Sequence, residues 1–352
     1  MSCTVGAFIF PMVWEAWGRD EATRMFQALK DFGVNTIATE SETYRDDLIE
    51  LAHRLEMHFI GGIACFSEHG RDHQPLRDRP ELWPILENGE RRPLMEWYIG
   101  VTPTFDDYNG SRLALVERLM RDHDLDGMCL DFIRWPLHWE LELRPGEPEP
   151  LQSSFDPHTV QRFLLYAGLE LPPGRDMPAS QAAWILSEHR DAWTDFKCSV
   201  ITNFVAQARE RIRAHRGATA KLGVYLVPAP DERRAYLVGQ RVSDLSPVVD
   251  FLAPMVYHPV LHQTPVWAEQ TIDEIARLAP GKVLPVLQVD SAEGEEMGAD
   301  WGPPVPVEAW RQVACYAAAQ RDTQGLVAFT GTSLFRDGRG AILAECLADS
   351  QR

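Results

Sequence analysis

Short apolar runs alternate along the chain with longer stretches in which apolar residues recur every three or four positions. The first unit has an apolar run at 5–10, an amphipathic stretch at 20–32 that ends at Gly33, and an apolar run at 34–38. Such runs are typical of buried strands, and the helical spacing predicts a helix between them. The pattern continues with predicted strands at 58–66, 127–132, 222–227, 251–256, 283–289 and 325–329, and with predicted helices at 44–55, 111–121, 184–215, 242–248, 267–278, 306–320 and 340–347.

Eight apolar strands separated by helices predict an α/β fold with a parallel sheet. In a chain of 352 residues this count favours one (β/α)8 TIM barrel that covers residues 1–352. A doubly wound open sheet is the weaker alternative, because no Gly-x-Gly-x-x-Gly motif follows the first strand.

Three long irregular segments follow particular strands. They lie at 67–100 after the third strand, at 137–183 after the fourth and at 290–305 after the seventh. All three are on the strand-to-helix side, which forms the active-site face of a barrel. We expect the segments 67–100 and 137–183 to be lid-like insertions of a single domain.

The charge balance excludes some classes of partner. The net charge of −18 repels nucleic acid and anionic membrane surfaces, and no apolar run approaches the roughly 20 residues of a membrane span. The start of the chain lacks the basic region of a signal peptide, so we expect a cytoplasmic protein, although a trimmed secreted chain would look the same. The composition leaves the oligomeric state open.

The six cysteines are scattered and form no Cys-x-x-Cys pair. This pattern is typical of buried free thiols in a reducing compartment. The histidines show no His-x-x-x-His or His-Glu-x-x-His spacing, so we expect no metal site and no cofactor.

The most informative stretch is DGMCLDFIRWP at 126–136, where a buried strand ends in an acid. Asp131 should lie at the carboxyl end of the fourth strand, and Arg134 is close enough to keep it ionised. A structural ion pair between two loops would give the same pattern. An acid at this end of a barrel strand is more often a site residue, however.

This stretch resembles the DGxxLDxxRxP signature of glycoside-hydrolase-like barrels, the bacterial glycosyl-hydrolase-like 10 group and its relatives. More distantly, it is similar to the DGxDxDxE strand of chitinase-type barrels. The resemblance implies a barrel that acts on carbohydrate. It extends over most of the chain, through 102–105, 154–163, the helix with Trp184 and Trp193, 250–258 and 284–288.

The chain also departs from the chitinase pattern. Cys129 stands at its middle aspartate, Ile133 at its catalytic glutamate, and His258 at the aspartate of the MxYD strand. Substrate-assisted hydrolysis of N-acetyl sugars is therefore not expected, and hydrolysis would need another pair of carboxylates.

We looked for the partner of Asp131 at other strand ends. Asp290 after the seventh strand is the first choice as a catalytic residue, followed by Glu232 after the fifth and Glu40 after the second. Taken singly, each of these acids is more typical of a solvated loop residue than of a catalyst.

Several polar and aromatic residues at the same strand ends suit substrate binding. Phenol, imidazole and amide groups could bind sugar hydroxyls, and tryptophan rings in strand-to-helix loops could stack on a pyranose. The alternative is that these side chains satisfy buried backbone groups or pack in the loops. The predicted substrate-binding residues are Glu40, Arg134, Trp135, Tyr257, His258, Gln288, Trp14 and Trp97.

We therefore predict a metal-independent glycoside hydrolase whose partner is a carbohydrate substrate. The alternative is a non-catalytic carbohydrate-binding barrel that kept the groove and lost the acid. A lyase or aldolase is disfavoured, because the four lysines fall on helices or just before strands, away from the active-site face. The sequence leaves open the sugar, the linkage and the stereochemistry.

Overall fold

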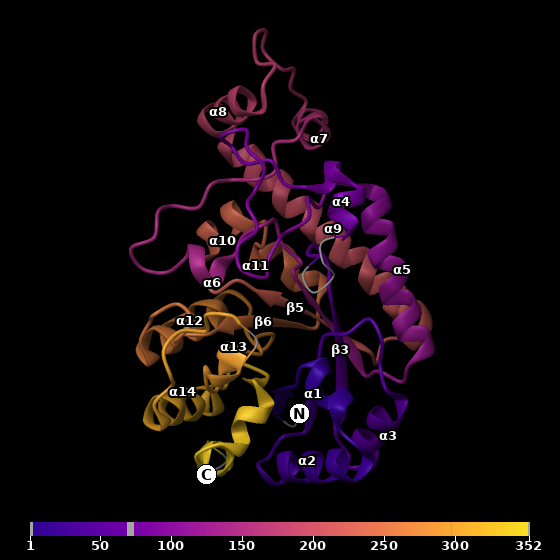
Figure 1. The fold of residues 1–352 in the computed structure, drawn as a ribbon, viewed down its shortest axis with the longest axis vertical. Helices are drawn as coiled ribbons and strands as arrows, with labels where there is room; N and C mark the ends of the chain where they lie inside the picture. Colours follow the sequence, from indigo (N-terminus) through magenta and orange to yellow (C-terminus); the bar gives the residue numbers. More distant parts are fainter. Residues whose placement is uncertain (1–2, 69–73, 297, 351–352) are drawn as a thin grey trace.

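The computed structural model describes residues 3–68, 74–296 and 298–350 as a closed barrel (Figure 1). Eight parallel strands follow one another around the barrel in sequence order, and β8 pairs with β1. This arrangement confirms the predicted (β/α)8 barrel. The strands are β1 (Thr4–Phe8), β2 (Thr36–Ala38), β3 (His58–Ala64), β4 (Gly127–Asp131), β5 (Lys221–Leu226), β6 (Phe251–Val256), β7 (Val286–Gln288) and β8 (Gly325–Phe329).

Alternate strand residues fill the inside of the barrel. Cys129, Tyr225, Phe251 and Met255 belong to one buried cluster there. Gly223 makes room for it, because a Cβ atom at this position would lie 2.0 Å from Cε2 of Phe251. The barrel is thus a packed core, and ligands can reach it only at the ends of the strands.

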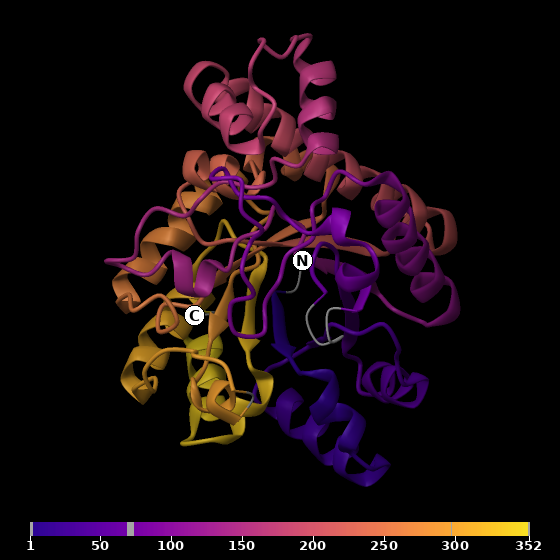
Figure 2. The ribbon, with the colours of Figure 1, turned by 45° about the horizontal axis from the view of Figure 1, so that its top comes forward.

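Helices surround the strands, and α7 and α8 project beyond the barrel (Figures 1 and 2). The α-helices are α1 (Pro11–Ala16), α2 (Arg19–Asp31), α3 (Asp46–Arg54), α4 (Gln74–Asp78), α5 (Asp106–Asp122), α6 (Trp139–Glu142), α7 (Pro157–Ala167), α8 (Pro178–Glu188), α9 (Arg190–Arg216), α10 (Asp231–Val238), α11 (Val242–Leu245), α12 (Pro265–Leu278), α13 (Ala292–Glu296), α14 (Val307–Ala319) and α15 (Arg339–Ser350). Short 3-10 turns lie at Pro80–Leu82, Ser246–Val248 and Gly331–Phe335.

The predicted helix at 184–215 is two helices. The backbone leaves the helical conformation at His189, with φ −134° and ψ 26°, so α8 ends and α9 begins there. The continuous apolar pattern across the break arises because both helices bury tryptophan, Trp184 in α8 and Trp193 in α9.

The segments after β3 and β4 contact each other above the barrel. Arg92 forms an ion pair with Glu142, and the Tyr98 hydroxyl accepts a hydrogen bond of 3.1 Å from the backbone N–H of Leu137. Residues 69–73 of the first segment, and residue 297 of the segment after β7, lie outside the described residues.

Two cysteines predicted to be free thiols form a disulfide. Cys315 of α14 and Cys346 of α15 are bonded, with their Cα atoms 4.6 Å apart. The prediction was wrong for this pair because α14 and α15 pack against each other, which a separation of 31 residues does not reveal. Cys3, Cys65, Cys129 and Cys198 are free.

Within the described residues, no helix is both long and apolar enough to cross a membrane.

Candidate active site

Asp131 is the last residue of β4 and lies at the carboxyl end of the barrel. Its side chain is 18% exposed, and Oδ1 accepts a hydrogen bond of 2.6 Å from the N–H of Phe132. Arg134 is buried, and its Nη1 lies 3.6 Å from the same oxygen. The guanidinium carbon is 4.5 Å from the centre of the Phe132 ring, which holds it in place. An amide and a guanidinium therefore stabilise negative charge on a carboxylate that solvent can still reach.

Two buried tyrosines lie beside this carboxylate. The pKa of Tyr225 is raised well above its usual value, first by burial and then by the electrostatic influence of neighbours that include Cys129, Asp131 and Glu40. Burial, Asp131 and Glu140 raise the pKa of Tyr257 in the same way. Both phenols therefore keep their protons at neutral pH and can donate hydrogen bonds.

Three carboxylates contribute to the raised pKa values of these tyrosines. The charge of Asp131 raises the pKa of both phenols. That of Glu40 raises the pKa of Tyr225, and that of Glu140 raises the pKa of Tyr257. The sequence predicted Asp131, Glu40 and Tyr257 for the active-site face but missed Tyr225 and Glu140. Glu140 is the first acid after the 126–136 stretch, and that position was the available signal.

Glu140 belongs to the short helix α6 and lies beside a buried histidine. Nδ1 of His138 lies 3.2 Å from Oε2 of Glu140, and Nε2 lies 3.8 Å from Oε2 of Glu96. The His138 ring also packs against Trp97, with ring centres 5.2 Å apart. Neither ring nitrogen of His138 has a hydrogen-bond partner among the described residues, so these are close contacts between an imidazole and two carboxylates.

Aromatic rings flank the carboxylates on two sides. Half-buried Trp97 contacts Phe132 next to Asp131, with ring centres 6.1 Å apart. On the side of β7 and β8, Tyr257 stacks on Phe329 at 4.6 Å, and Trp301 lies 5.2 Å from Phe329. Trp97 and Trp301 are both partly exposed, as a ring that stacks on a sugar must be.

The other two predicted tryptophans lie in the protein core. Trp14 is buried and donates a hydrogen bond of 2.9 Å from Nε1 to Oγ1 of Thr39. Trp135 is buried and donates one of 3.1 Å to the carbonyl oxygen of Lys197. Their rings face protein, so this placement gives them a packing role instead of a sugar platform.

Gln288 and Asp290 are engaged by protein groups near β7. Nε2 of Gln288 donates to Oγ of Ser291 at 3.0 Å and to the carbonyl oxygen of Trp301 at 2.9 Å. Asp290 accepts a hydrogen bond of 2.8 Å from the N–H of Ser291, and its other oxygen lies 3.5 Å from Nη2 of Arg339. Through these contacts, both side chains fix the segment after β7.

Glu232 and His258 lie in contrasting environments. Glu232 is exposed in the first turn of α10. His258 is buried, and burial lowers its pKa to about 4, so it is neutral at physiological pH. Its Nδ1 has no hydrogen-bond partner among the described residues.

The chemistry available on this face is that of carboxylates and phenols. Across residues 3–68, 74–296 and 298–350 no group of three His, Cys, Asp or Glu side chains is placed to hold a metal ion.

Comparison with known proteins relates the fold to carbohydrate enzymes. No family model and no curated protein matches the sequence. The PgaB (BpsB) glycoside hydrolase domain from Bordetella bronchiseptica matches in structure with a TM-score of 0.71 and 11% identity, over 98% of this chain and 99% of that domain. The catalytic domain of β-amylase from Paenibacillus polymyxa matches with a TM-score of 0.62 and 10% identity, over 99% of both chains.

A β-galactosidase from Halorubrum lacusprofundi has a TM-score of 0.68 and 14% identity, and the chain spans 58% of its length. At identities this low, the structural matches show the fold alone. The chemistry must be argued from this chain's own residues. The chain has the fold of glycoside hydrolase (β/α)8 barrel domains.

Proposed function

We propose that the chain hydrolyses a glycosidic bond at the carboxyl end of the barrel, with Asp131 as nucleophile or base. The observation that carries the proposal is the setting of Asp131. It is a solvent-accessible carboxylate at a strand end, held by Arg134 and the Phe132 amide. Glycosidases need such a carboxylate together with a second carboxyl group across the scissile bond.

Glu140 is our first choice for the second carboxyl group. Its charge, together with that of Asp131, raises the pKa of Tyr257, and its Oε2 lies 3.2 Å from Nδ1 of the buried His138. Glu40 is the alternative, because its charge and that of Asp131 both raise the pKa of Tyr225. Asp290 ranks lower because it faces Arg339, and Glu232 ranks lower because it is exposed on α10.

The two carboxyl groups would divide the reaction between them. The acid gives its proton to the leaving glycosidic oxygen as that bond to the anomeric carbon breaks. In retention, Asp131 attacks the anomeric carbon and forms a glycosyl ester, which water then cleaves as the second group, now ionised, takes the proton of the water. In inversion, Asp131 takes a proton from the water that attacks the anomeric carbon directly. A separation of about 5–5.5 Å between the groups favours the first course and one of roughly 6.5–9.5 Å the second.

The aromatic residues suit a sugar substrate. The partly exposed rings of Trp97 and Trp301 can cover the apolar face of a pyranose. Tyr257 keeps its proton, because its pKa is raised, and can donate a hydrogen bond to a hydroxyl or to Asp131.

The test is product release from a panel of aryl glycosides and natural oligosaccharides, with the parent protein and the Asp131→Asn variant side by side. We expect turnover by the parent and a loss of at least about 10³-fold in the variant, because the amide cannot attack or accept a proton. Asp126→Asn is the matched control. Asp126 lies at the opposite end of β4, where it accepts a hydrogen bond of 2.7 Å from the N–H of Phe59.

Full activity of Asp131→Asn on a cleaved glycoside would overturn the proposal. Sugar binding without turnover on any linkage would favour instead a non-catalytic carbohydrate-binding barrel.

A further inference from the structure

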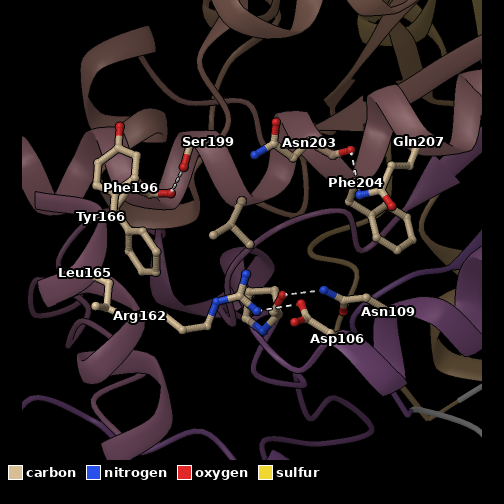
Figure 3. A pocket seen from close by; sticks show the side chains of 12 residues that line it. Asp106, Asn109, Arg162, Leu165, Tyr166, Phe196, Ser199, Asn203, Phe204 and Gln207 are labelled. Atoms are coloured by element: carbon tan, nitrogen blue, oxygen red, sulfur yellow. Dashed lines mark hydrogen bonds and ion pairs between the residues drawn. The ribbon is translucent and has the colours of Figure 1, made fainter.

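A groove lies on the outside of the barrel, between the start of α5, α7 and α9 (Figure 3). It encloses about 380 Å³, near the lower end of the range for small-molecule sites. Its lining comes from the outer helices and from Pro103 ahead of α5, and none of the residues assigned above to the candidate active site contributes to it.

The charges in the groove cancel. Arg162 crosses its floor, where Nη1 donates to the carbonyl oxygen of Thr104 at 2.5 Å and to Oδ1 of Asp106 at 2.6 Å (Figure 3). Because this guanidinium already has a carboxylate partner, the groove offers little attraction to an anionic ligand. The groove therefore suits a neutral ligand.

An exposed aromatic ring stands at one end of the groove. The side chain of Tyr166 is 51% exposed and its ring packs against Phe196, with ring centres 5.5 Å apart. Leu165, which is 74% exposed, lies beside it (Figure 3). A half-exposed aromatic ring can stack on the apolar face of a sugar.

The groove also contains a buried acceptor that lacks a partner. Nδ2 of Asn109 donates to the carbonyl oxygen of Pro103 at 2.9 Å, whereas Oδ1 is buried without a hydrogen-bond partner among the described residues. A ligand hydroxyl that reached this oxygen would satisfy it. Across the groove, exposed Asn203 and Gln207 present amides one turn apart on α9 (Figure 3).

We propose that this groove binds a neutral saccharide, as a second site on the outer helices. Tyr166 stacks on the sugar ring, and the amides of Asn109, Asn203 and Gln207 form hydrogen bonds with the hydroxyls around its edge. The volume fits a mono- or disaccharide unit, which could be part of a longer chain leaving through the open side. This proposal does not depend on hydrolysis, because the two sites share no residue.

The test is titration calorimetry with a panel of neutral hexose mono- and disaccharides and their longer oligomers. We expect one of these probes to bind, Tyr166→Ala to weaken its binding at least tenfold, and Tyr166→Phe to retain it because the ring is kept. Asn109→Ala should also weaken it. Leu278→Ala, which removes an exposed leucine of α12, is the matched control and should bind as the parent does.

Asp131→Asn tests whether the same probe binds at the candidate active site instead. Binding that Tyr166→Ala leaves intact and Asp131→Asn weakens would move the saccharide to the barrel's carboxyl end and overturn the groove assignment. Absence of binding by every probe at millimolar concentration would overturn it as well.

Discussion

At the level of single residues, Asp131 and Glu140 differ in how they are held. Asp131 has a guanidinium and a backbone amide as partners, which favours a fixed negative charge. Glu140 has no such donor: its Oε2 is buried without a hydrogen-bond partner among the described residues, although Nδ1 of His138 lies 3.2 Å away. This difference is the reason for assigning the nucleophile or base to Asp131 and the acid to Glu140.

Replacement of Glu140 by glutamine should show the kinetics of a lost general acid. We expect kcat/KM to fall by about 10²–10⁴-fold on glycosides with poor leaving groups, which need a proton. On aryl glycosides with acidic phenols the loss should be small, because those leaving groups depart as anions. Steady-state rates across a series of aryl leaving groups measure this.

Glu40→Gln is the control for that assignment. If Glu40→Gln shows the dependence on leaving group and Glu140→Gln does not, then Glu40 is the acid. Equal losses on all leaving groups in both variants would assign neither residue to proton transfer.

The sequence could identify some of these residues because of where they stand relative to strands. Asp131 and Glu40 end or follow buried apolar runs, so their inward direction follows from the alternation of the strand. Glu140 lies in a segment without periodicity, and no local rule gives its distance from β6. Gln288 was correctly placed at a strand end, but the backbone groups that occupy its amide come from a loop whose path the sequence does not specify.

At the level of elements, the strands were predictable and several helices were not. The strands are buried, so composition alone marks them. The helix α7 was missed, although Asp156 and Pro157 form a start signal and Asp156 accepts a hydrogen bond of 2.9 Å from the N–H of Thr159. The contact between α14 and α15 is tertiary, and the disulfide depends on it.

Removal of that disulfide should lower stability. It closes a segment of 31 residues, and a bridge of this span stabilises by about 2–4 kcal/mol, chiefly by restricting the unfolded chain. We expect the double variant Cys315→Ala, Cys346→Ala to lose this much free energy of unfolding, measured by urea denaturation. A reductant should lower the parent to the same value and leave the variant unchanged, whereas identical curves for parent and variant would contradict a bridge in the folded protein.

At the level of the whole molecule, a buried lysine joins segments that are far apart in sequence. Nζ of Lys197 in α9 donates to Oε1 of Gln152 at 2.7 Å and to the carbonyl oxygen of Leu237 at 3.0 Å, and it also reaches the carbonyl oxygen of Tyr236. It thereby ties the segment after β4 to α9 and α10. Burial, its largest influence, lowers the pKa of this lysine to about 7.

This pKa makes global stability depend on pH in a defined direction. Between about pH 7 and the usual lysine value of 10.5, the unfolded chain keeps the proton that the folded protein has lost. The unfolded state then binds more protons, so the contribution of Lys197 to the free energy of unfolding rises with pH, by up to about 1.4 kcal/mol per pH unit. Below pH 7 both states are protonated, and burial of the ammonium group carries its full cost.

The measurement is urea unfolding of the parent and of Lys197→Met at pH 7, 8 and 9. The net charge of −18 becomes more negative over this range and weakens both proteins through self-repulsion, so only their difference is informative. We expect the free energy of unfolding of the parent to increase relative to that of Lys197→Met at each step in pH. If the free energies of unfolding of the two proteins change with pH in parallel, then Lys197 has the same pKa in the folded and unfolded states. Its three acceptors would then stabilise the ammonium group as well as water does.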